Sequence, residues 1–566
     1  MIQTVVLSSL HRVFPQICPE DKKITRITTL KDEPVSFQVA FKLSDEKLTK
    51  QAFNIAVDSK ADLSCYLVSY VPVLHTHIAD YDDIPAPGLY PDMLLPKVVD
   101  FEITEQGYNP IKHTKEQAKY EDTHLFATDD SWQSLWITFN EQKKSLNAGV
   151  YRVQLDLVDL KANDKLGSAE IEIEVINASL SKQKFIYTNW FYCDCLSQFY
   201  KEEMFSDRFF EIVENYLKVA AKNGMNMVLT PTFTPALDTP VGEERQTAQL
   251  VKITKTDSGY EFDFSLLKRF IDVCKKAGIE YFEHAHLFSQ WGAKYCPKIM
   301  ATVNGKEKQI FGWHVKADSK KYRKFLEAYL PAVCEFFDSQ GLRKKVLFHI
   351  SDEPNNNNIE VYKKAVKTVG NLLDGYMCGD ALSHYAFYER GIVKMPIVCT
   401  HALNDFVGKC KNFWAYYTGG EIGGGLSNRL IVNNPENNRM MGIQMYYMGA
   451  SGFLHWGYNC YFDRMSKGLF DPKVTPGGYS MHPGTSYCVY PSYDGRAIQS
   501  PRQKVFGEGI NDIKALKCYE NLYGRSAAKS LIEKHFGVVT AYTCPSNPEQ
   551  LLSFRAELNN LIAKAK

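Results

Sequence analysis

The stretch KKVLFHISDEP, residues 344–354, decides the fold of this chain. Its apolar run KVLFHI is typical of a buried strand, and it leads directly into Asp352, Glu353 and Pro354. Pro354 cannot continue a central strand, and it biases the residue before it away from helix. We therefore expect both acids at the end of a strand, where a parallel barrel places its active site. A helix N-cap is the alternative, because acids are also favoured at helix starts.

Segments typical of strands and of helices alternate on both sides of this stretch. From about residue 184, strand-like runs such as FIYTNWFY (185–192) and PIVCTHA (396–402) alternate with amphipathic segments such as DRFFEIVENYLKVAAKNG (207–224). The eighth and last of these strands is GFLHWGYN (452–459). Alternation of this length predicts a parallel sheet, and eight units predict a closed (β/α)8 TIM-like barrel. An open doubly wound sheet would want a glycine-rich phosphate turn after its first strand, and the sequence has none there.

The sequence before the barrel has a different period. Short runs such as PVSFQVAFKL (34–43) and AEIEIEVINASL (169–180) alternate apolar and polar residues, and turn signals separate them. This pattern predicts antiparallel strands that pack as a β-sandwich. We therefore expect an N-terminal β-sandwich domain over residues 1–180. The catalytic barrel is expected over residues 181–566, with a C-terminal loop and a helical extension after its eighth strand.

Composition excludes several classes of function. The 66 Lys and Arg residues balance 65 Asp and Glu, and this formal net charge of +1 gives no attraction to nucleic acid or to an anionic membrane. No apolar run of about 20 residues predicts membrane insertion. The first apolar stretch lacks a basic start and stops at His11 and Arg12, so we expect no signal peptide and a cytoplasmic location. The 14 cysteines show no disulfide pattern, and the oligomeric state is left open.

The adjacency of the two acids restricts the chemistry. Most glycosidases place two carboxylates about 5–9 Å apart on either side of the scissile bond. Neighbouring residues of one strand point in divergent directions and cannot flank one sugar in this way. An adjacent pair fits a reaction in which the 2-acetamido oxygen of the substrate attacks C1. One acid then orients and polarises the amide, and the other protonates the leaving oxygen.

The strand ending in SDEP, the preceding sandwich and the tail RQKVFGEGINDIKALKCY (502–519) together resemble glycoside hydrolase family 123. The resemblance covers most of the chain, and the characterised members of the family are β-N-acetylgalactosaminidases. It implies a retaining enzyme that acts on β-linked N-acetylhexosamine, with N-acetylgalactosamine favoured. Carried over, Asp352 orients the acetamido group and Glu353 is the general acid/base. The tail departs from the family pattern at 504–505 and 514–516, which bears on the subgroup and not on catalysis.

A sugar site also needs aromatic rings, because ring faces cover the apolar face of a pyranose. Seven aromatic residues lie at or near the ends of the first, seventh and eighth expected strands. The candidates for substrate binding are Trp190, Tyr192, Trp414, Tyr416, Tyr417, Trp456 and Tyr458. Trp456 is the favoured platform, because Gly457 and Asn459 mark the end of its strand. Packing in the core of a large barrel is an equally good interpretation of each ring.

Polar residues after other strands complete the candidate site. Asp380 follows the fifth strand and His401 the sixth, and both could hydrogen-bond sugar hydroxyls. His284 and His286 lie two apart on the third strand and so share a face, as the ligands of a metal ion would. No further ligand set accompanies them, so we expect no metal and no cofactor. We assign His286 and the nearby Trp291 to contacts with the substrate.

Two alternatives remain open. The glycine-rich TGGEIGGGL (418–426) carries Glu421 just past the seventh strand. Glu353 as acid/base with Glu421 as nucleophile would make a conventional two-carboxylate retaining glycosidase. The second alternative is a non-catalytic carbohydrate-binding protein on a barrel scaffold, and the intact acid pair argues against it. In every case the expected partner is a glycan or a glycoconjugate.

Overall fold

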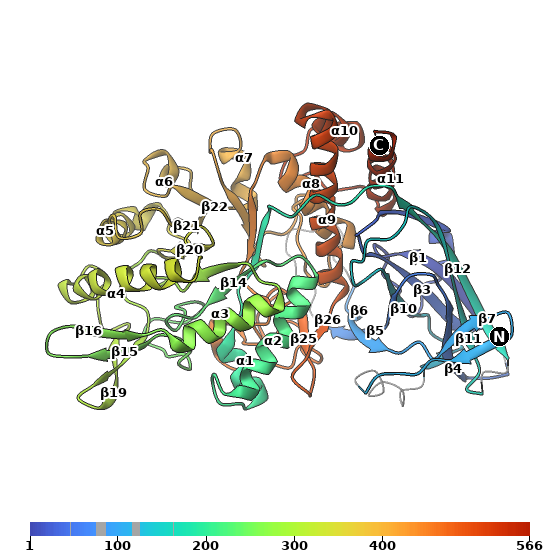
Figure 1. Cartoon of the computed structure of the whole chain (residues 1–566), viewed down its shortest axis with the longest axis horizontal. Coiled ribbons are helices and arrows are strands. Elements are labelled where there is room, and N and C mark those ends of the chain that lie inside the picture. The colour runs from blue at the N-terminus through green and yellow to red at the C-terminus, as the bar shows by residue number, and fades with distance from the viewer. Residues whose placement is uncertain (46, 75–85, 116–124, 162–163, 566) are drawn as a thin grey trace.

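The computed structural model of the protein describes residues 1–45, 47–74, 86–115, 125–161 and 164–565. A two-sheet sandwich lies at one end of the molecule and a closed eight-stranded parallel barrel at the other, as Figure 1 shows. The predicted fold class, a TIM-like barrel preceded by a β-sandwich, is therefore confirmed.

The N-terminal sandwich consists of two sheets. Its strands are β1 (Ile2–Ser8), β2 (Arg26–Leu30), β3 (Val35–Leu43), β4 (Lys50–Asp58), β5 (Leu63–Val73), β6 (Gly88–Lys97), β7 (Phe101–Thr104), β8 (Gly107–Pro110), β9 (Leu125–Thr128), β10 (Gln133–Phe139), β11 (Gly149–Val158), β12 (Lys165–Ile176), β25 (Val489–Pro491) and β26 (Ala497–Gln499). The first sheet has the order β1-β3-β10-β5-β6-β26-β25 and the second β2-β12-β11-β4-β7-β8, with β9 beside β4. Most neighbours are antiparallel, while β2 with β12 and β4 with β7 are parallel. Val39 and Phe41 of the first sheet and Ile55 and Ile171 of the second belong to one buried core, because alternate residues of each strand face inward.

The barrel follows the order of the chain. Its strands are β13 (Ile186–Asn189), β14 (Met227–Thr230), β17 (Tyr281–His284), β20 (Val346–His349), β21 (Met377–Leu382), β22 (Met395–Cys399), β23 (Trp414–Tyr417) and β24 (Gly452–His455). All neighbours pair in parallel, and β24 closes the barrel on β13. Each strand overlaps one of the eight segments that the sequence predicts. The carboxyl ends of all eight strands therefore meet at one end of the barrel, where the functional site is expected.

Helices cover the outside of the barrel. They are α1 (Cys193–Tyr200), α2 (Asp207–Lys222), α3 (Ser265–Ala277), α4 (Lys320–Ser339), α5 (Ile359–Val369), α6 (Ala386–Glu389), α7 (Leu403–Phe406) and α8 (Pro435–Met448). Short 3-10 turns are η1 (Glu20–Lys22), between β1 and β2 of the sandwich, and η3 (Asn356–Asn358), η4 (Thr400–Ala402) and η5 (Arg464–Ser466), which follow barrel strands. Two of the longer helices, α2 and α4, have a serine as N-cap: Ser206 accepts a hydrogen bond from the Phe209 amide and Ser319 from the Tyr322 amide. Such caps satisfy amides that the first helical turn leaves unpaired.

A small four-stranded sheet lies beside the barrel. It consists of β15 (Lys252–Lys255), β16 (Tyr260–Asp263), β18 (Ile299–Val303) and β19 (Lys306–Phe311), in the order β16-β15-β18-β19. These strands come from the connections after β14 and β17, and they extend away from the sandwich in Figure 1. The sequence does not predict β15 and β16, because runs of four residues are too short to show a period.

The C-terminal tail joins the two parts of the molecule. Its helices are α9 (Pro501–Tyr523), α10 (Arg525–Phe536) and α11 (Pro548–Lys564), and α9 lies between barrel and sandwich in Figure 1. A Cβ atom on Gly442 of α8 would lie only 2.1 Å from the Gly509 carbonyl oxygen of α9, so glycines allow these two helices to pack closely. Arg502 of α9 forms a buried ion pair with Asp92 of β6, at 2.8 Å. The predicted last helix is thus followed by two more.

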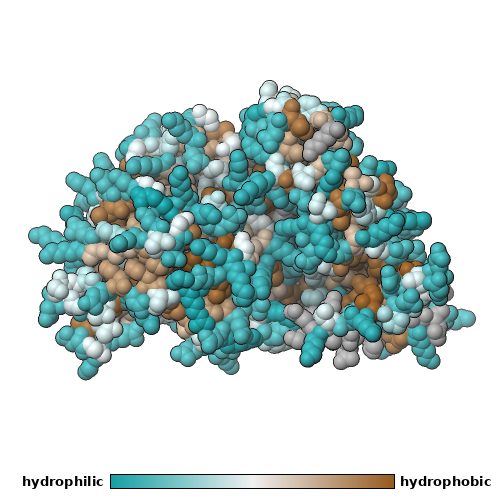
Figure 2. All heavy atoms as spheres, in the orientation of Figure 1, coloured by the Kyte–Doolittle hydropathy of each residue, from teal (hydrophilic) through white to brown (hydrophobic). Residues whose placement is uncertain are grey.

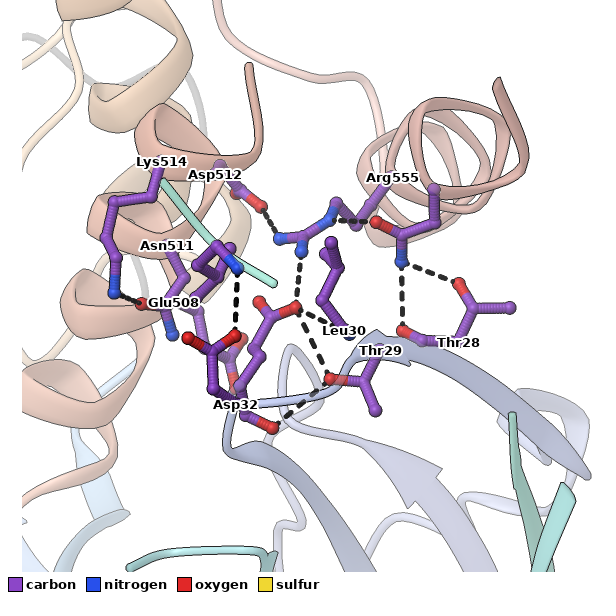
Figure 3. A network of polar contacts seen from close by, with 12 residues as sticks. Thr28, Thr29, Leu30, Asp32, Glu508, Asn511, Asp512, Lys514 and Arg555 are labelled. Carbon is purple, nitrogen blue, oxygen red and sulfur yellow. Dashed lines mark hydrogen bonds and ion pairs between the residues drawn. The ribbon is translucent and has the colours of Figure 1, made fainter. Parts of the chain in front are cut away.

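A second buried network ties α11 to the sandwich. Arg555 donates to Asp512 of α9 at 2.7 Å and to Glu33, which follows β2, at 2.5 Å. Asn559 donates to the backbone and side chain of Thr28. Figure 3 shows Arg555 between the helix that carries Asp512 and the strand that carries Thr28. The sandwich is therefore held to the barrel by charged contacts as well as by apolar packing.

The distribution of hydrophilic and hydrophobic residues on the surface is that of an ordinary folded protein. Hydrophilic residues prevail on the face that Figure 2 shows, with separate apolar patches over the barrel and over the sandwich. Within the described part of the chain, no helix has both the length and the apolar composition that crossing a membrane requires.

Candidate active site

A cavity of about 420 Å³ opens at the carboxyl ends of the barrel strands. Both acids of the SDEP segment line it. The two long connections after β14 and β24 contribute further walls, through Asp238 from the first and Arg464 and His482 from the second. A volume of this size matches a binding site for a small molecule, about 300–1,000 Å³.

The acids do not cap the helix that follows them. β20 ends at His349, and the cap of the next helical turn is Asn355, whose side chain accepts from the Asn357 amide. Asn358 completes a reciprocal capping box with Asn355. Asp352 and Glu353 therefore lie between strand and cap and face the cavity.

Asp352 is buried, with 8% of its surface exposed. Its carbonyl oxygen accepts from the Trp291 amide at 2.7 Å, which fixes the backbone at this position. Burial and the neighbouring charge of Glu353 raise the pKa of the Asp352 carboxyl well above its usual range. Both effects disfavour the charged form, as expected of two acids in a site with little water.

Glu353 is held from two sides. Its amide donates to the Ala381 carbonyl at 3.1 Å, and the Tyr416 hydroxyl donates to its Oε1 atom at 2.7 Å. Burial raises the pKa of the Glu353 carboxyl, while the hydrogen bond from Tyr416 acts to lower it. Since the pKa values of both Asp352 and Glu353 are raised, the pair retains a proton at pH values where ordinary carboxyl groups are fully ionised.

The cavity wall contains strained backbone. Asp238, Trp291 and Glu353 line it with φ angles of 43°, 57° and 43°, in the left-handed region. Left-handed residues other than glycine cost about 1–3 kcal/mol each and concentrate at functional sites. Asp238 accepts from the Ser466 amide, and Ser466 is itself left-handed with a φ of 54°. Contacts from the surrounding fold therefore hold these lining residues in an unfavourable backbone conformation, as is typical of a functional site.

Four of the seven aromatic candidates from the strand ends line the cavity, and Trp291 does so as well. Those that line it are Trp190, Tyr192, Trp291, Tyr416 and Trp456. The Tyr192 hydroxyl donates to the Trp456 carbonyl at 2.9 Å, which links two of these residues. The structure thus brings the acid pair and these rings together around one cavity, as a sugar site requires.

The other three rings do not line the cavity. Trp414 packs so closely on Gly452 that a Cβ atom there would lie 2.6 Å from its ring. Tyr417 lies on the opposite face of β23 from Tyr416, against Phe453 at 5.0 Å between ring centroids. Tyr458 is buried, and its hydroxyl donates to the Tyr216 carbonyl at 2.9 Å. These three rings pack in the core, the alternative interpretation that the sequence leaves open.

Asp380 lies beneath the acid pair and not in the cavity wall. It is fully buried, and its Oδ1 atom accepts from the Ile350 and Ser351 amides, each at 3.1 Å. The Tyr362 hydroxyl donates to its Oδ2 atom. Asp380 therefore fixes the strand end that carries Asp352 and Glu353, a positioning role that its sequence position did not reveal.

A buried Glu–His–Asp chain crosses the barrel interior. His349 lies between Glu283, at 2.7 Å, and Asp380, at 3.3 Å. Although burial acts to lower it, these two carboxylates raise the pKa of His349 to about 10, so the imidazole is charged at neutral pH. Glu283 also accepts from the indole N–H of the cavity residue Trp190 at 2.6 Å. This chain was not predicted from the sequence, although a charged residue inside each of two apolar strands is a signal for it.

The two histidines of the third strand do not form a metal site. His284 contacts the Ala285 carbonyl and the hydroxyl of Tyr329 through its two ring nitrogens. His286 stacks on His349, with 4.5 Å between ring centroids, and does not line the cavity. Both are interior residues of the barrel.

Glu421 and His401 lie beside the cavity. The Glu421 carboxylate accepts from the Thr418 amide at 2.6 Å and hydroxyl at 2.8 Å, and lies 3.2 Å from His401 Nδ1. Neither residue is among those that line the cavity. With Cys399 they form a group whose potential ligand atoms all lie within 4.8 Å of one another. Within the described ranges, this is the cluster that could hold a metal ion.

An adjacent acid pair with raised pKa values and aromatic rings around a cavity, at the carboxyl end of a barrel, are the arrangement of a glycoside hydrolase. A family profile described as glycoside hydrolase 123, catalytic domain, matches residues 190–519, which include the whole site. The chain belongs to glycoside hydrolase family 123. The resemblance that the sequence analysis draws is therefore confirmed.

One solved structure supports the fold. A family 123 glycoside hydrolase from Clostridium perfringens, described in connection with glycolipid glycan hydrolysis, is similar with a TM-score of 0.70 and 13% identity, over 100% of this chain and 97% of that one. A family 39 glycoside hydrolase from Bacteroides cellulosilyticus has 9% identity and a TM-score of 0.32, over 88% of this chain and 83% of that one. No curated protein matches the sequence.

Proposed function

We propose that the protein is a retaining glycosidase for β-linked N-acetylhexosamine, with N-acetylgalactosamine favoured, and that the 2-acetamido group of the substrate is the nucleophile. The observation that carries this proposal is the adjacent pair of buried Asp352 and half-buried Glu353 at one cavity wall, where the pKa values of both carboxyl groups are raised. Because Asp352 and Glu353 are adjacent in the chain, they cannot act on one sugar from opposite sides. A glycan of a glycoconjugate is the substrate class that we infer.

In the first step Glu353 donates its proton to the glycosidic oxygen as the bond from that oxygen to C1 breaks. The acetamido oxygen attacks C1 from the other side and forms a five-membered ring. The Asp352 carboxylate accepts a hydrogen bond from the acetamido N–H and stabilises the positive charge that develops on the ring. The pair enters this step with one proton, and the raised pKa values of both carboxyl groups favour this state.

In the second step water attacks C1 and the carbon–oxygen bond of the ring breaks. Glu353, now ionised, takes the proton of that water and returns to its starting state. Two inversions at C1 give net retention. Tyr416 supports both forms of Glu353, because its hydroxyl can donate to a carboxylate or to the carbonyl oxygen of a carboxylic acid.

The conventional two-carboxylate alternative finds less support. It needs a nucleophile across the cavity from Glu353, and Glu421 is instead engaged by Thr418 and His401 outside the lining. Asp238 does line the cavity, but the backbone of Ser466 occupies its carboxylate. The non-catalytic alternative does not explain an acid pair kept protonated by burial.

A panel of aryl β-glycosides tests the proposal. We expect hydrolysis of the N-acetylgalactosaminide first and the N-acetylglucosaminide second, with product of retained configuration by NMR. The plain galactoside and glucoside lack the acetamido group and should be hydrolysed far more slowly. Comparable cleavage of the plain galactoside would overturn the proposal in favour of a protein nucleophile.

A further inference from the structure

Three residues with different metal-binding groups converge beside the catalytic cavity. Cys399 ends β22, His401 lies in the η4 turn that follows it, and Glu421 lies in the loop after β23. The Sγ atom, an imidazole nitrogen and a carboxylate oxygen all lie within 4.8 Å of one another. In a tetrahedral zinc site such atoms are about 3.3–3.8 Å apart, since bonds to zinc are about 2.0–2.3 Å long. A closure of roughly 1 Å, within reach of the half-exposed His401 side chain, would complete the geometry.

The backbone that carries these groups is fixed. Asn428 donates to the carbonyls of Thr418 and Glu421, each at 2.8 Å, and so closes the loop after β23. The Tyr542 hydroxyl donates to the His401 carbonyl at 3.2 Å. The Glu421 carboxylate is oriented by Thr418 through one oxygen, and its other oxygen faces His401 Nδ1 at 3.2 Å. A ligand set held in this way needs little ordering to bind an ion.

The chemistry of the three groups selects the kind of ion. A thiolate and an imidazole favour zinc and similar thiophilic cations over magnesium or calcium, which prefer oxygen. One thiolate and one carboxylate balance the charge of a divalent cation. Three protein ligands leave a fourth position for water, and the exposed side of His401 gives access to it. We propose that Cys399, His401 and Glu421 bind a thiophilic divalent cation such as Zn²⁺, and that the bound ion slows hydrolysis.

The inhibitory effect follows from the closeness of the three ligand residues to the acid/base Glu353, and it rests on the proposed function. Tyr416 interacts with both Cys399 and Glu353, so a single side chain separates the ion from the carboxyl group. The charges of His401 and Glu421 already act on Glu353. A divalent cation among them would favour ionised Glu353 and remove the proton that the leaving group needs. The ion is thus an inhibitor and not a cofactor of the reaction.

Cobalt titration of the purified, reduced and chelator-treated protein tests the binding half without any turnover. We expect one equivalent of Co²⁺ to give a thiolate-to-cobalt charge-transfer band in the near ultraviolet, and Zn²⁺ to displace it. Cys399→Ser should abolish the band, and His401→Ala should weaken cobalt binding at least tenfold. His401 is exposed enough that its replacement should not disturb folding, so the test does not depend on the buried cysteine alone.

Cys410→Ser is the matched control, because Cys410 is a half-buried cysteine of the next segment that lies outside the cluster. It should keep the band unchanged. No band in the unaltered protein, or a band that survives Cys399→Ser, would overturn the proposed site. The second result would place the metal on another cysteine.

Zinc titration of hydrolysis tests the inhibitory half. Activity of the unaltered enzyme should fall with the same midpoint as zinc binding and return when a chelator is added. In His401→Ala, compared with its own metal-free rate, the midpoint should move at least tenfold higher. If zinc displaces cobalt but leaves the rate of hydrolysis unchanged at the same zinc concentrations, inhibition is contradicted. A protein inactive on every glycoside would instead contradict the proposed function, and the cobalt band alone would decide the metal site.

Discussion

Asp352 and Glu353 are neighbours in the chain, yet their surroundings differ. Asp352 is almost fully buried in the cavity wall, whereas Glu353 accepts a hydrogen bond from Tyr416 and adopts a left-handed backbone. The role of Glu353 involves the leaving group and the role of Asp352 does not. Substitutions of the two residues should therefore have distinguishable effects.

Glu353→Gln should lose about 10²–10⁴-fold in rate on a natural glycan, the value of general acid–base help. It should lose much less in the first step on a nitrophenyl glycoside, whose leaving group needs little protonation. Asp352→Asn should lose activity on both substrates by similar factors and should bind a thiazoline mimic of the cyclic intermediate more weakly. Steady-state kinetics on both substrates make the comparison. The reverse pattern would mean that the two roles are exchanged.

Tyr416→Phe should change the pH dependence of kcat/KM. Burial raises the pKa of Glu353, and the hydrogen bond from Tyr416 opposes that rise. Removing the hydroxyl therefore raises the pKa further, and protonated Glu353 persists to higher pH. The alkaline limb of the profile should shift to higher pH than in the unaltered enzyme. A limb that stays in place, or shifts to lower pH, would show that Glu353 is not the group that titrates there.

Glu421→Ala should keep substantial activity. As a residue beside the cavity it should matter by about tenfold or less, roughly the 1.4 kcal/mol of one modest contact. As a nucleophile its loss would be nearly complete, and azide would restore turnover with an inverted product. The rate with and without azide, measured without metal, separates these cases.

At the scale of elements, β20 and β21 are joined beneath the cavity by Asp380. It accepts from two backbone amides that follow β20, and it pairs with the charged His349. The strand end that carries the acids is thus fixed by a neighbouring strand. Its position depends on this buried contact and not on the loop itself.

Asp380→Ala should destabilise the fold by about 3–5 kcal/mol, because it leaves His349 with an incomplete set of partners and two buried amides unpaired. Urea unfolding measures this loss. Asp380→Asn is the matched variant, since it keeps an oxygen for the amides of Ile350 and Ser351 and should lose less stability. If alanine and asparagine are equally tolerated, Asp380 does not position the strand end.

Most of these elements could be predicted from the sequence, because eight strands of a barrel repeat one strong pattern. The four-residue strands β15 and β16 could not, since so short a run shows no period. The site was predictable where chain order fixes it: Asp352 and Glu353 follow a strand and therefore lie at the cavity. The choice between Tyr416 and Tyr417 depends on which face of β23 points inward, and a shift of one residue reverses it. The His349 pairs join strands that lie far apart in the sequence, so no local pattern indicates them.

At the scale of the whole molecule, the sandwich and the barrel share one buried core. Tyr66 and Trp136 of the sandwich belong to the same cluster as Phe453 and Leu229 of the barrel. The networks around Arg502 and Arg555 add buried charges to this junction. We therefore expect the two parts to unfold together in a single transition.

Arg555→Ala should cost about 3–5 kcal/mol of stability, because it removes the cation that pairs with the buried Glu33, whereas Asp512 keeps its ion pair with Arg439. Arg152→Ala removes an exposed ion pair with Glu170, which solvent screens, and should leave stability nearly unchanged. Calorimetry of both variants checks the difference. Two separate transitions, or equal effects of the two substitutions, would contradict the common core.

The short hairpin β25–β26 has a consequence for how the chain is made. It is synthesised after the entire barrel, yet it extends the sheet that contains β1, and β26 pairs with β6. On the ribosome, this edge of β6 therefore stays unpaired while about 400 further residues are synthesised, and an unpaired strand edge is a site where other chains pair. The sandwich therefore cannot complete its folding as an independent unit, and its last folding step is the pairing of β26 with β6.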